Sequence, residues 1–147
     1  MKSILVPVDF SDATPRVIET ASRMAKAFGG RVVLLHIVEP EPDFVGFEPG
    51  PATVRMSVAR DFKAEHQQLE DLKASLAGTG LDVTALQIRG STAEKILLEA
   101  ATHEAGLIVM GSHGHGALYE LLVGSVTTGV LRAARCPVVI VPVRQEQ

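Results

Sequence analysis

The sequence predicts an α/β fold in which a doubly wound, five-stranded parallel sheet is covered by helices on both faces. Five short runs rich in Val, Ile and Leu, bounded by Gly, Pro or Asp, are typical of strands that are buried on both faces. Segments with apolar residues at helical spacing fill the gaps between these runs. Strands and helices therefore alternate along the chain, and this alternation favours parallel strands joined by right-handed crossovers.

The expected strands are short apolar runs that end beside turn-forming residues. They comprise residues 4–8, 31–38, 81–88, 107–110 and 137–143. The third run alternates between apolar and polar residues more than the others, so we expect a half-exposed strand at an edge of the sheet. Ligands of such sheets bind beyond the carboxyl ends of the strands. Asp9, residues 37–39 and residues 111–115 follow strands at that end.

Apolar stripes predict four helices, at residues 14–28, about 53–77, 91–104 and 125–134. Thr14 is expected to cap the first helix, with Pro15 at its first helical position and residues 29–30, two glycines, at its end. Ser91 and Glu94 have the spacing of a capping box at the start of the third helix. The segment 39–52 holds four prolines, and we expect either a loop beside the ligand site or a plain surface connection.

Composition excludes several classes of protein. The 147 residues, 46% of them hydrophobic and 21% charged, fit one globular domain. The net charge of −3, without a basic block, argues against nucleic acid as a partner. Apolar runs fall short of the ~20 residues of a membrane span, and the N-terminal apolar core is too short for a signal peptide. Cys136 is the only cysteine, which excludes an intrachain disulfide, so the expected location is the cytoplasm.

A glycine pattern indicates a phosphate-binding site near the fourth expected strand. Gly111 and Gly114 follow this strand, and after nine more residues Gly124 and Ser125 stand where the last helix begins. Glycines let the backbone approach a ligand closely, and the N–H groups of a helix start favour anions. The pattern is neither a Walker motif, since no Gly-Lys-Ser/Thr follows, nor a dinucleotide fingerprint, since the first strand leads to Asp9 rather than to glycines.

The order and spacing of several segments resemble the universal stress protein family, in its ATP-binding branch. The similar segments are residues 6–11, 34–38, 109–114, 122–126 and 136–138. The resemblance covers the whole chain, so it implies one nucleotide-binding domain over residues 1–147. It also implies the strand order 3-2-1-4-5, with ATP or another adenine nucleotide bound at the carboxyl edge. Mg²⁺ would enter with the nucleotide and be held mainly by its phosphates.

The resemblance also implies roles for individual residues. Asp9 would accept hydrogen bonds from ribose hydroxyls or from the adenine edge, and Ile37 would contact adenine through its backbone. Gly111, Gly114, Gly124 and Ser125 would hold ribose and phosphates. The pocket would further include Pro7, Val8, Met110 and Val126. The residues themselves leave two alternatives open, because Asp9 would also suit a cap of the first helix and Ser125 a simple N-cap.

The histidines and the cysteine suggest weaker hypotheses. His113 is expected to touch phosphate, whereas a metal site at His113 and His115 is disfavoured, because zinc sites need three or four ligands. His36 lies in a buried strand and is expected to be a core histidine with satisfied hydrogen bonds. His66 and His103 are expected on helix surfaces. Cys136 is interpreted as a small buried residue, with redox sensing as the alternative.

Three functions are compatible with the sequence. The favoured hypothesis is a nucleotide-dependent regulator of a stress response that acts through an unknown protein partner. A slow ATPase or a related adenine-nucleotide hydrolase is the second, although no set of nucleophile, base and orienting group is found. The third is a partner-binding scaffold with an empty pocket. The last strand, between Val138 and Val143, should lie at an edge of the sheet, and the resemblance implies a homodimer through it.

Overall fold

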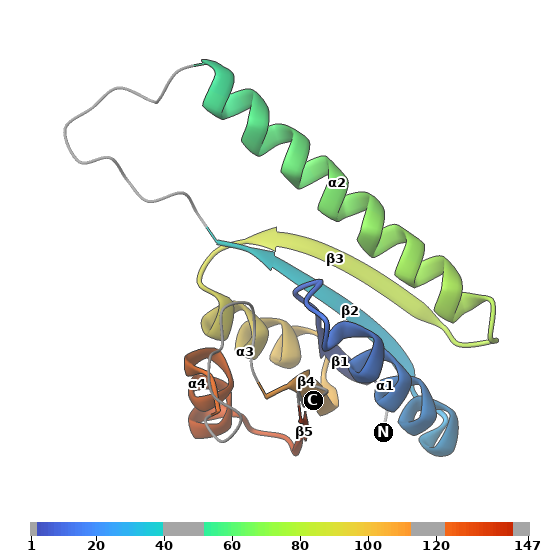
Figure 1. Ribbon diagram of the computed structural model, residues 1–147. Helices are drawn as coiled ribbons and strands as arrows, with labels where there is room; N and C mark the ends of the chain where they lie inside the picture. Colours follow the sequence, from blue (N-terminus) through green and yellow to red (C-terminus); the bar gives the residue numbers. More distant parts are fainter. Residues whose placement is uncertain (1–2, 40–51, 113–122, 143–147) are drawn as a thin grey trace, which may run out of the picture.

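Five parallel strands form one sheet in the order β3-β2-β1-β4-β5 (Figure 1). The computed structural model describes residues 3–39, 52–112 and 123–142, with side chains from residue 59 onward in the second of these ranges. The strands are β1 (Ser3–Pro7), β2 (Arg31–Val38), β3 (Val83–Arg89), β4 (Ala105–Gly111) and β5 (Val138–Val141). The predicted fold class and strand order are thus confirmed.

All strand pairs of the sheet are parallel and in simple register, apart from one irregularity where β1 meets β4. Ser3 pairs with Arg31, and Val38 at the end of β2 pairs with Arg89 at the end of β3. The two edge strands are β3 and β5, as the sequence predicts. Most residues of β3 are partly exposed, in agreement with its alternating pattern.

Helices cover both faces of the sheet (Figure 1). They are α1 (Thr14–Phe28), α2 (Ala52–Ala77), α3 (Thr92–Thr102) and α4 (Ser125–Ala133). On one face α1 packs on the central strands while α2 runs along β2 and β3. On the other face α3 and α4 pack against each other and against the sheet. None of the helices in the described part of the chain is long and apolar enough to cross a membrane.

Two apolar clusters, one on each face of the sheet, form the core. Alternate residues of β1 contribute to opposite clusters: Ile4 and Val6 pack with α1 and α2, whereas Leu5 packs with α3 and α4. All three of these side chains are fully buried. This arrangement explains why the central strands are continuous apolar runs rather than alternating ones.

Two predicted helix caps differ from the structure. The N-cap of α1 is Ala13, so Thr14 is the first helical residue and Pro15 the second. The reason is the preceding turn, in which Phe10 has a φ of 59° and the Thr14 N–H donates to the Ser11 carbonyl. Ser91 is the N-cap of α3, as predicted, but its side chain makes no capping hydrogen bond.

Two helices end earlier than predicted. The helix α3 ends at Thr102, because His103 has left the helical conformation and Glu104 has a φ of 50°. His103 is therefore a C-cap residue rather than a residue on the helix surface. Its side chain is only 21% exposed and lies 3.1 Å from the Glu99 carboxylate. The helix α4 ends at Ala133, one residue early, because Ala134 is extended.

Candidate functional site

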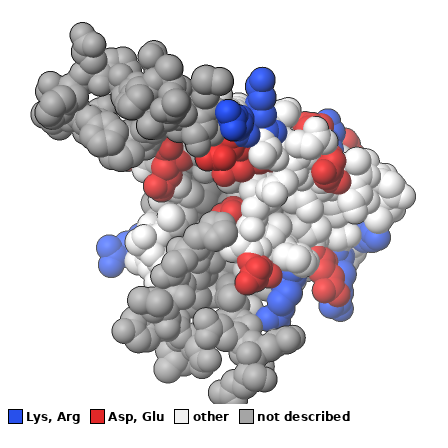
Figure 2. Space-filling model, turned by 45° about the horizontal axis from the view of Figure 1, so that its top comes forward, with Lys and Arg blue, Asp and Glu red and all other residues white. Residues whose placement is uncertain are grey.

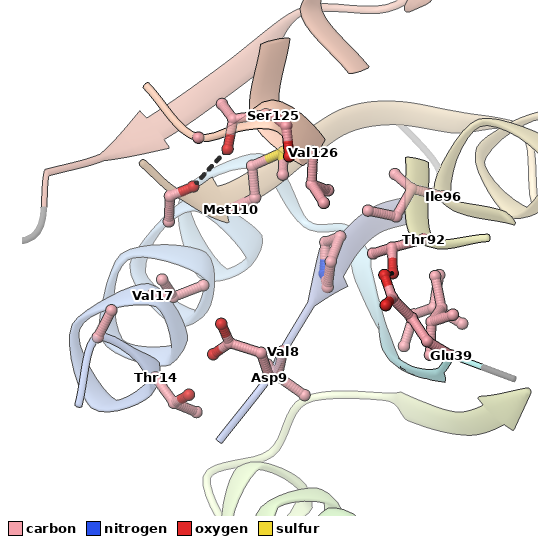
Figure 3. A pocket seen from close by; sticks show the side chains of 17 residues that line it. Val8, Asp9, Thr14, Val17, Glu39, Thr92, Ile96, Met110, Ser125 and Val126 are labelled. Atoms are coloured by element: carbon pink, nitrogen blue, oxygen red, sulfur yellow. Dashed lines mark hydrogen bonds between the residues drawn. The ribbon is translucent and has the colours of Figure 1, made fainter. Parts of the chain in front are cut away.

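A cavity of about 500 Å³ lies at the carboxyl edge of the sheet (Figure 3). Most of the residues predicted to bind nucleotide line it. They are Pro7, Val8 and Asp9 at the end of β1, Ile37 on β2, Met110 and Gly111 on β4, and Gly124, Ser125 and Val126 at the start of α4. The predictions for His113 and Gly114, and the disfavoured metal site with His115, fall outside the described residues.

The end of β1 brings Asp9 to the centre of this edge. The Val8 N–H donates to the Leu35 carbonyl at 2.8 Å, which extends the contact of β1 with β2 up to the cavity. Asp9 Oδ1 accepts a hydrogen bond of 2.9 Å from the Ser11 N–H, the pattern of an Asx turn. Asp9 therefore shapes the turn before α1 and does not cap that helix, whose N-cap is Ala13. Its side chain points into the cavity (Figure 3).

The start of α4 is tied to the end of β4. The Gly124 N–H donates to the Ser112 carbonyl at 2.9 Å, and the Thr127 hydroxyl donates to the Gly111 carbonyl at 3.1 Å. Gly124 is the N-cap, so the alternative that Ser125 is a simple N-cap is wrong. Because glycine has no capping side chain, the first N–H groups of α4 keep no side-chain cap and favour an anion at the cavity.

The end of β2 and the start of α3 form another corner of the cavity. The Thr92 hydroxyl donates to Glu39 Oε1 at 3.0 Å, and both residues line the cavity. The sequence places Glu39 among the residues that follow strands at the carboxyl edge, but it predicts no ligand contact for Glu39 or Thr92. Glu39 follows β2 at the same edge of the sheet as Asp9, and this position could have identified it as a residue that lines the cavity. Thr92 carried no signal, because its role depends on a contact with a residue 53 positions away.

A buried histidine, His36, contacts the backbone of Val8 in the wall of the cavity. His36 is 6% exposed, and its Nδ1 and Nε2 atoms lie 2.8 Å from the Val8 carbonyl and 2.9 Å from the Glu65 carboxylate. The ring of Phe10 packs on it, with the ring centroids 4.6 Å apart. The prediction of a core histidine with satisfied hydrogen bonds is confirmed. His36 thus links β2, the end of β1 and α2 (through Glu65).

The chemistry of the cavity differs from one part to another. Apolar side chains such as Val17, Ile96 and Met110 form much of its wall and suit a flat aromatic ring. Of the described lining residues, Asp9 and Glu39 carry charge, and both are acidic. Figure 2 shows both acidic and basic side chains on the described part of this face of the molecule. The cavity therefore offers carboxylates for hydroxyl or amino donors and a helix start for an anion.

Comparison with known proteins relates the whole chain to one family. A sequence model of the Universal stress protein family matches residues 1–142. The universal stress protein encoded in the QAH/OAS sulfhydrylase 3′ region of Thermus aquaticus is 36% identical over 143 residues, which cover 95% of this chain and 98% of that protein. The solved structure of MJ0577 from Methanocaldococcus jannaschii has a TM-score of 0.80 at 27% identity and covers 99% of this chain and 98% of its own.

More distant structures share the fold and include nucleotide complexes. A universal stress protein in complex with cAMP is 21% identical, with a TM-score of 0.68 over 95% of this chain and 96% of its own. A universal stress protein from Archaeoglobus fulgidus in complex with dAMP is 20% identical, with a TM-score of 0.65 over 95% of this chain and 97% of its own. At this identity the likeness concerns the fold.

Proposed function

Because the chain belongs to the universal stress protein family, we propose that it is an ATP-binding regulator of a stress response whose nucleotide-bound state is recognised by a partner protein. The observation that carries this proposal is the cavity at the carboxyl edge, where the glycine N-cap of α4 faces the same space as Asp9 on β1. Two related folds are complexes with the adenine nucleotides cAMP and dAMP, which supports this ligand class.

The proposed binding mode assigns each part of ATP to a part of the cavity. The phosphates lie at the start of α4, where Gly111 and Gly124 allow a close approach and Ser125 offers a hydroxyl and an N–H group. Ribose hydroxyls donate to the Asp9 carboxylate. Adenine fills the apolar part of the cavity beside Ile37.

Mg²⁺ fits this proposal through the charge of the cavity. The charged residues of its described lining are acidic, so a triphosphate needs its own counterion there. The phosphates supply most of the oxygen ligands of the ion. His113, in the segment that the structure does not describe, is proposed to touch phosphate.

We propose binding, not turnover, as the role of the nucleotide. Oδ1 of Asp9, the central carboxylate, accepts the Ser11 N–H of the turn before α1, which suits a residue that orients a ligand. We also propose a cytoplasmic protein that forms a homodimer through β5, the apolar edge strand of the sheet.

Isothermal titration of the protein with ATP, with and without Mg²⁺, tests the proposal, with Gly124→Val as the variant. Gly124 has a φ of −63° and a ψ of 164°, which valine tolerates, so the substitution adds volume at the helix start without backbone strain. We expect saturable binding by the native chain, strengthened by Mg²⁺ and lost in the variant.

The matched control is Gly78→Val, since Gly78 lies after α2 and away from the cavity lining. This control should bind ATP as the native chain does. If the folded native chain binds no nucleotide, the regulator hypothesis fails and the scaffold hypothesis takes its place. Multiple turnover of ATP well above the background rate would favour the ATPase hypothesis instead.

A further inference from the structure

Glu39 and Thr92 form one corner of the cavity, where a hydrogen bond joins their side chains. The hydroxyl of Thr92, the first residue of α3, donates to Glu39 Oε1 at 3.0 Å. The backbone beneath them is fixed, because the Gly90 N–H donates to the Val38 carbonyl at 3.1 Å. Gly90 has a φ of 149° and turns the chain from β3 into α3. The Glu39 side chain is therefore held at the mouth of the cavity by a residue of another element (Figure 3).

One oxygen of this carboxylate is open to a ligand within the part of the chain that the structure describes. In the part of the chain that the structure describes, Oε1 accepts the Thr92 hydroxyl, and Oε2 accepts no hydrogen bond. Glu39 is exposed, so the contact with Thr92 adds little to the stability of the fold. Its main effect is to orient the carboxylate, so that the second oxygen, Oε2, can accept a hydrogen bond from a ligand donor.

The sheet order places this corner and the anion-binding end of the cavity on opposite sides of Asp9. The strands β2 and β4 flank β1 on opposite sides, so Glu39, which follows β2, and Gly111, which ends β4, lie on either side of Asp9. The start of α4 favours negative charge, whereas a carboxylate at the opposite corner repels it and favours a donor. A ligand with an anionic end and an amino-bearing ring fits this polarity.

We infer that Glu39, positioned by Thr92, selects adenine by accepting a hydrogen bond from its exocyclic 6-amino group. The inference rests on the proposed function and adds the base specificity of the same cavity. Hypoxanthine carries a 6-oxo group in the same place, and this acceptor faces the carboxylate unfavourably. Guanine also has a 6-oxo group in this place, so the carboxylate disfavours it for the same reason.

The test compares the dissociation constants of ATP, ITP and GTP by isothermal titration at one Mg²⁺ concentration. ATP and ITP differ in the 6-amino and 6-oxo groups and in the proton on N1. The variants are Glu39→Gln, whose amide donates to a 6-oxo group, and Thr92→Val, which removes the hydroxyl at nearly constant shape. Glu94→Gln is the matched control, because this exposed residue of α3 undergoes the same charge change and does not line the cavity.

We expect the native chain and Glu94→Gln to bind ATP about tenfold or more tightly than ITP, the effect of one hydrogen bond to a charged group. In Glu39→Gln the dissociation constants of ATP and ITP should differ by less than about twofold, or ITP should bind more tightly than ATP. The reason is that an amide can accept from a 6-amino group or donate to a 6-oxo group. Thr92→Val should give an intermediate ratio.

Three outcomes would overturn the inference. An unchanged ratio of ATP to ITP binding in Glu39→Gln would show that the base is recognised elsewhere, while nucleotide binding itself would stand. Tighter binding of GTP than of ATP would show that this corner does not select adenine. An unchanged ratio in Thr92→Val alone would remove the positioning role of Thr92. Failure of the native chain to bind any of the three nucleotides would instead refute the proposed function.

Discussion

The Nδ1 atom of His36 lies 2.8 Å from the carbonyl oxygen of Val8, and this contact joins the buried core to the wall of the cavity. A carbonyl oxygen only accepts, so His36 donates through Nδ1. Its Nε2 atom lies 2.9 Å from the Glu65 carboxylate on α2. The imidazole of His36 therefore connects the turn that carries Asp9 to α2.

The substitution His36→Leu should destabilise the protein and weaken ATP binding. Leucine fills a similar volume but donates no hydrogen bond, so the buried Val8 carbonyl loses the imidazole donor. We expect a loss of about 1–3 kcal/mol in the free energy of unfolding, measured in urea.

The control for this prediction is His66→Leu on α2. The side chain of His66 is 55% exposed, so its substitution should stay within about 0.5 kcal/mol of the native value. Equal effects of the two substitutions would contradict a structural role of the contact between His36 and Val8.

Gly90→Ala should be destabilising because of the backbone conformation at the start of α3. The φ of 149° at Gly90 is one that residues with a Cβ atom rarely adopt, and an added Cβ would lie 2.5 Å from Lys95 Cε. The flexible end of Lys95 can move, so we expect the backbone to dominate, with a loss of about 1–3 kcal/mol in thermal or urea unfolding.

Gly78→Ala provides the comparison for Gly90. An added Cβ at Gly78 meets backbone oxygens at an ordinary 3.4 Å, so its effect on the free energy of unfolding should stay within about 0.5 kcal/mol. If the two alanine variants unfold alike, the Gly90 turn does not constrain the corner that holds Glu39 and Thr92.

Most of the fold was predictable because its signals are local and periodic. The run Arg31–Val38 is apolar apart from Arg31 and His36 and lies between a pair of glycines and a proline-rich segment, and the structure has a strand with the same bounds. The helix Thr14–Phe28 also has its predicted bounds, since it shows a clear apolar stripe and ends at Gly29. The central position of β1 followed from the family resemblance rather than from periodicity.

The details that escaped the sequence depend on contacts between distant residues or on backbone angles. Thr14 is of a residue type typical of caps, but the turn with the left-handed Phe10 places the N-cap at Ala13. Glu39 and Thr92 meet only because β2 and β3 end side by side. Such pairings are set by tertiary structure, so residue type and spacing do not reveal them.

Cys136 should react slowly with thiol reagents in the native protein. Cys136 is partly rather than fully buried, and this partial burial raises the pKa of its thiol, so near neutral pH its thiolate fraction is smaller than that of an exposed cysteine. The thiolate is the reactive form, and the reaction with a disulfide reagent should accelerate only as the pH rises toward and beyond the ordinary thiol pKa.

The protein unfolded in urea is the reference for Cys136, because there the thiol regains its ordinary pKa and access. The native rate at neutral pH should be clearly lower than the unfolded rate. A native rate equal to or above the unfolded rate would reveal an accessible, activated thiol and would favour the redox-sensing alternative.

The homodimer proposed through β5 should depend on the backbone N–H of Ile140. The Pro137 and Val141 carbonyls accept hydrogen bonds of 3.0 Å from Ile108 and Ser112, so alternate residues of β5 face β4 and Ile140 faces the free edge. Ile140→Pro removes this edge donor and leaves the hydrogen bonds to β4 in place, whereas Ile140→Ala removes a similar part of the side chain and keeps the donor.

Sedimentation velocity should therefore show a dimer for the native chain and for Ile140→Ala, and a monomer with native circular dichroism for Ile140→Pro. The alanine variant separates loss of the edge donor from loss of apolar packing, because the Ile140 side chain also packs on the core. A proline variant that remains dimeric would place the interface elsewhere on the molecule. A native chain that sediments as a monomer at every concentration would refute the dimer itself, and Pro142 would then be a residue that protects the edge of β5.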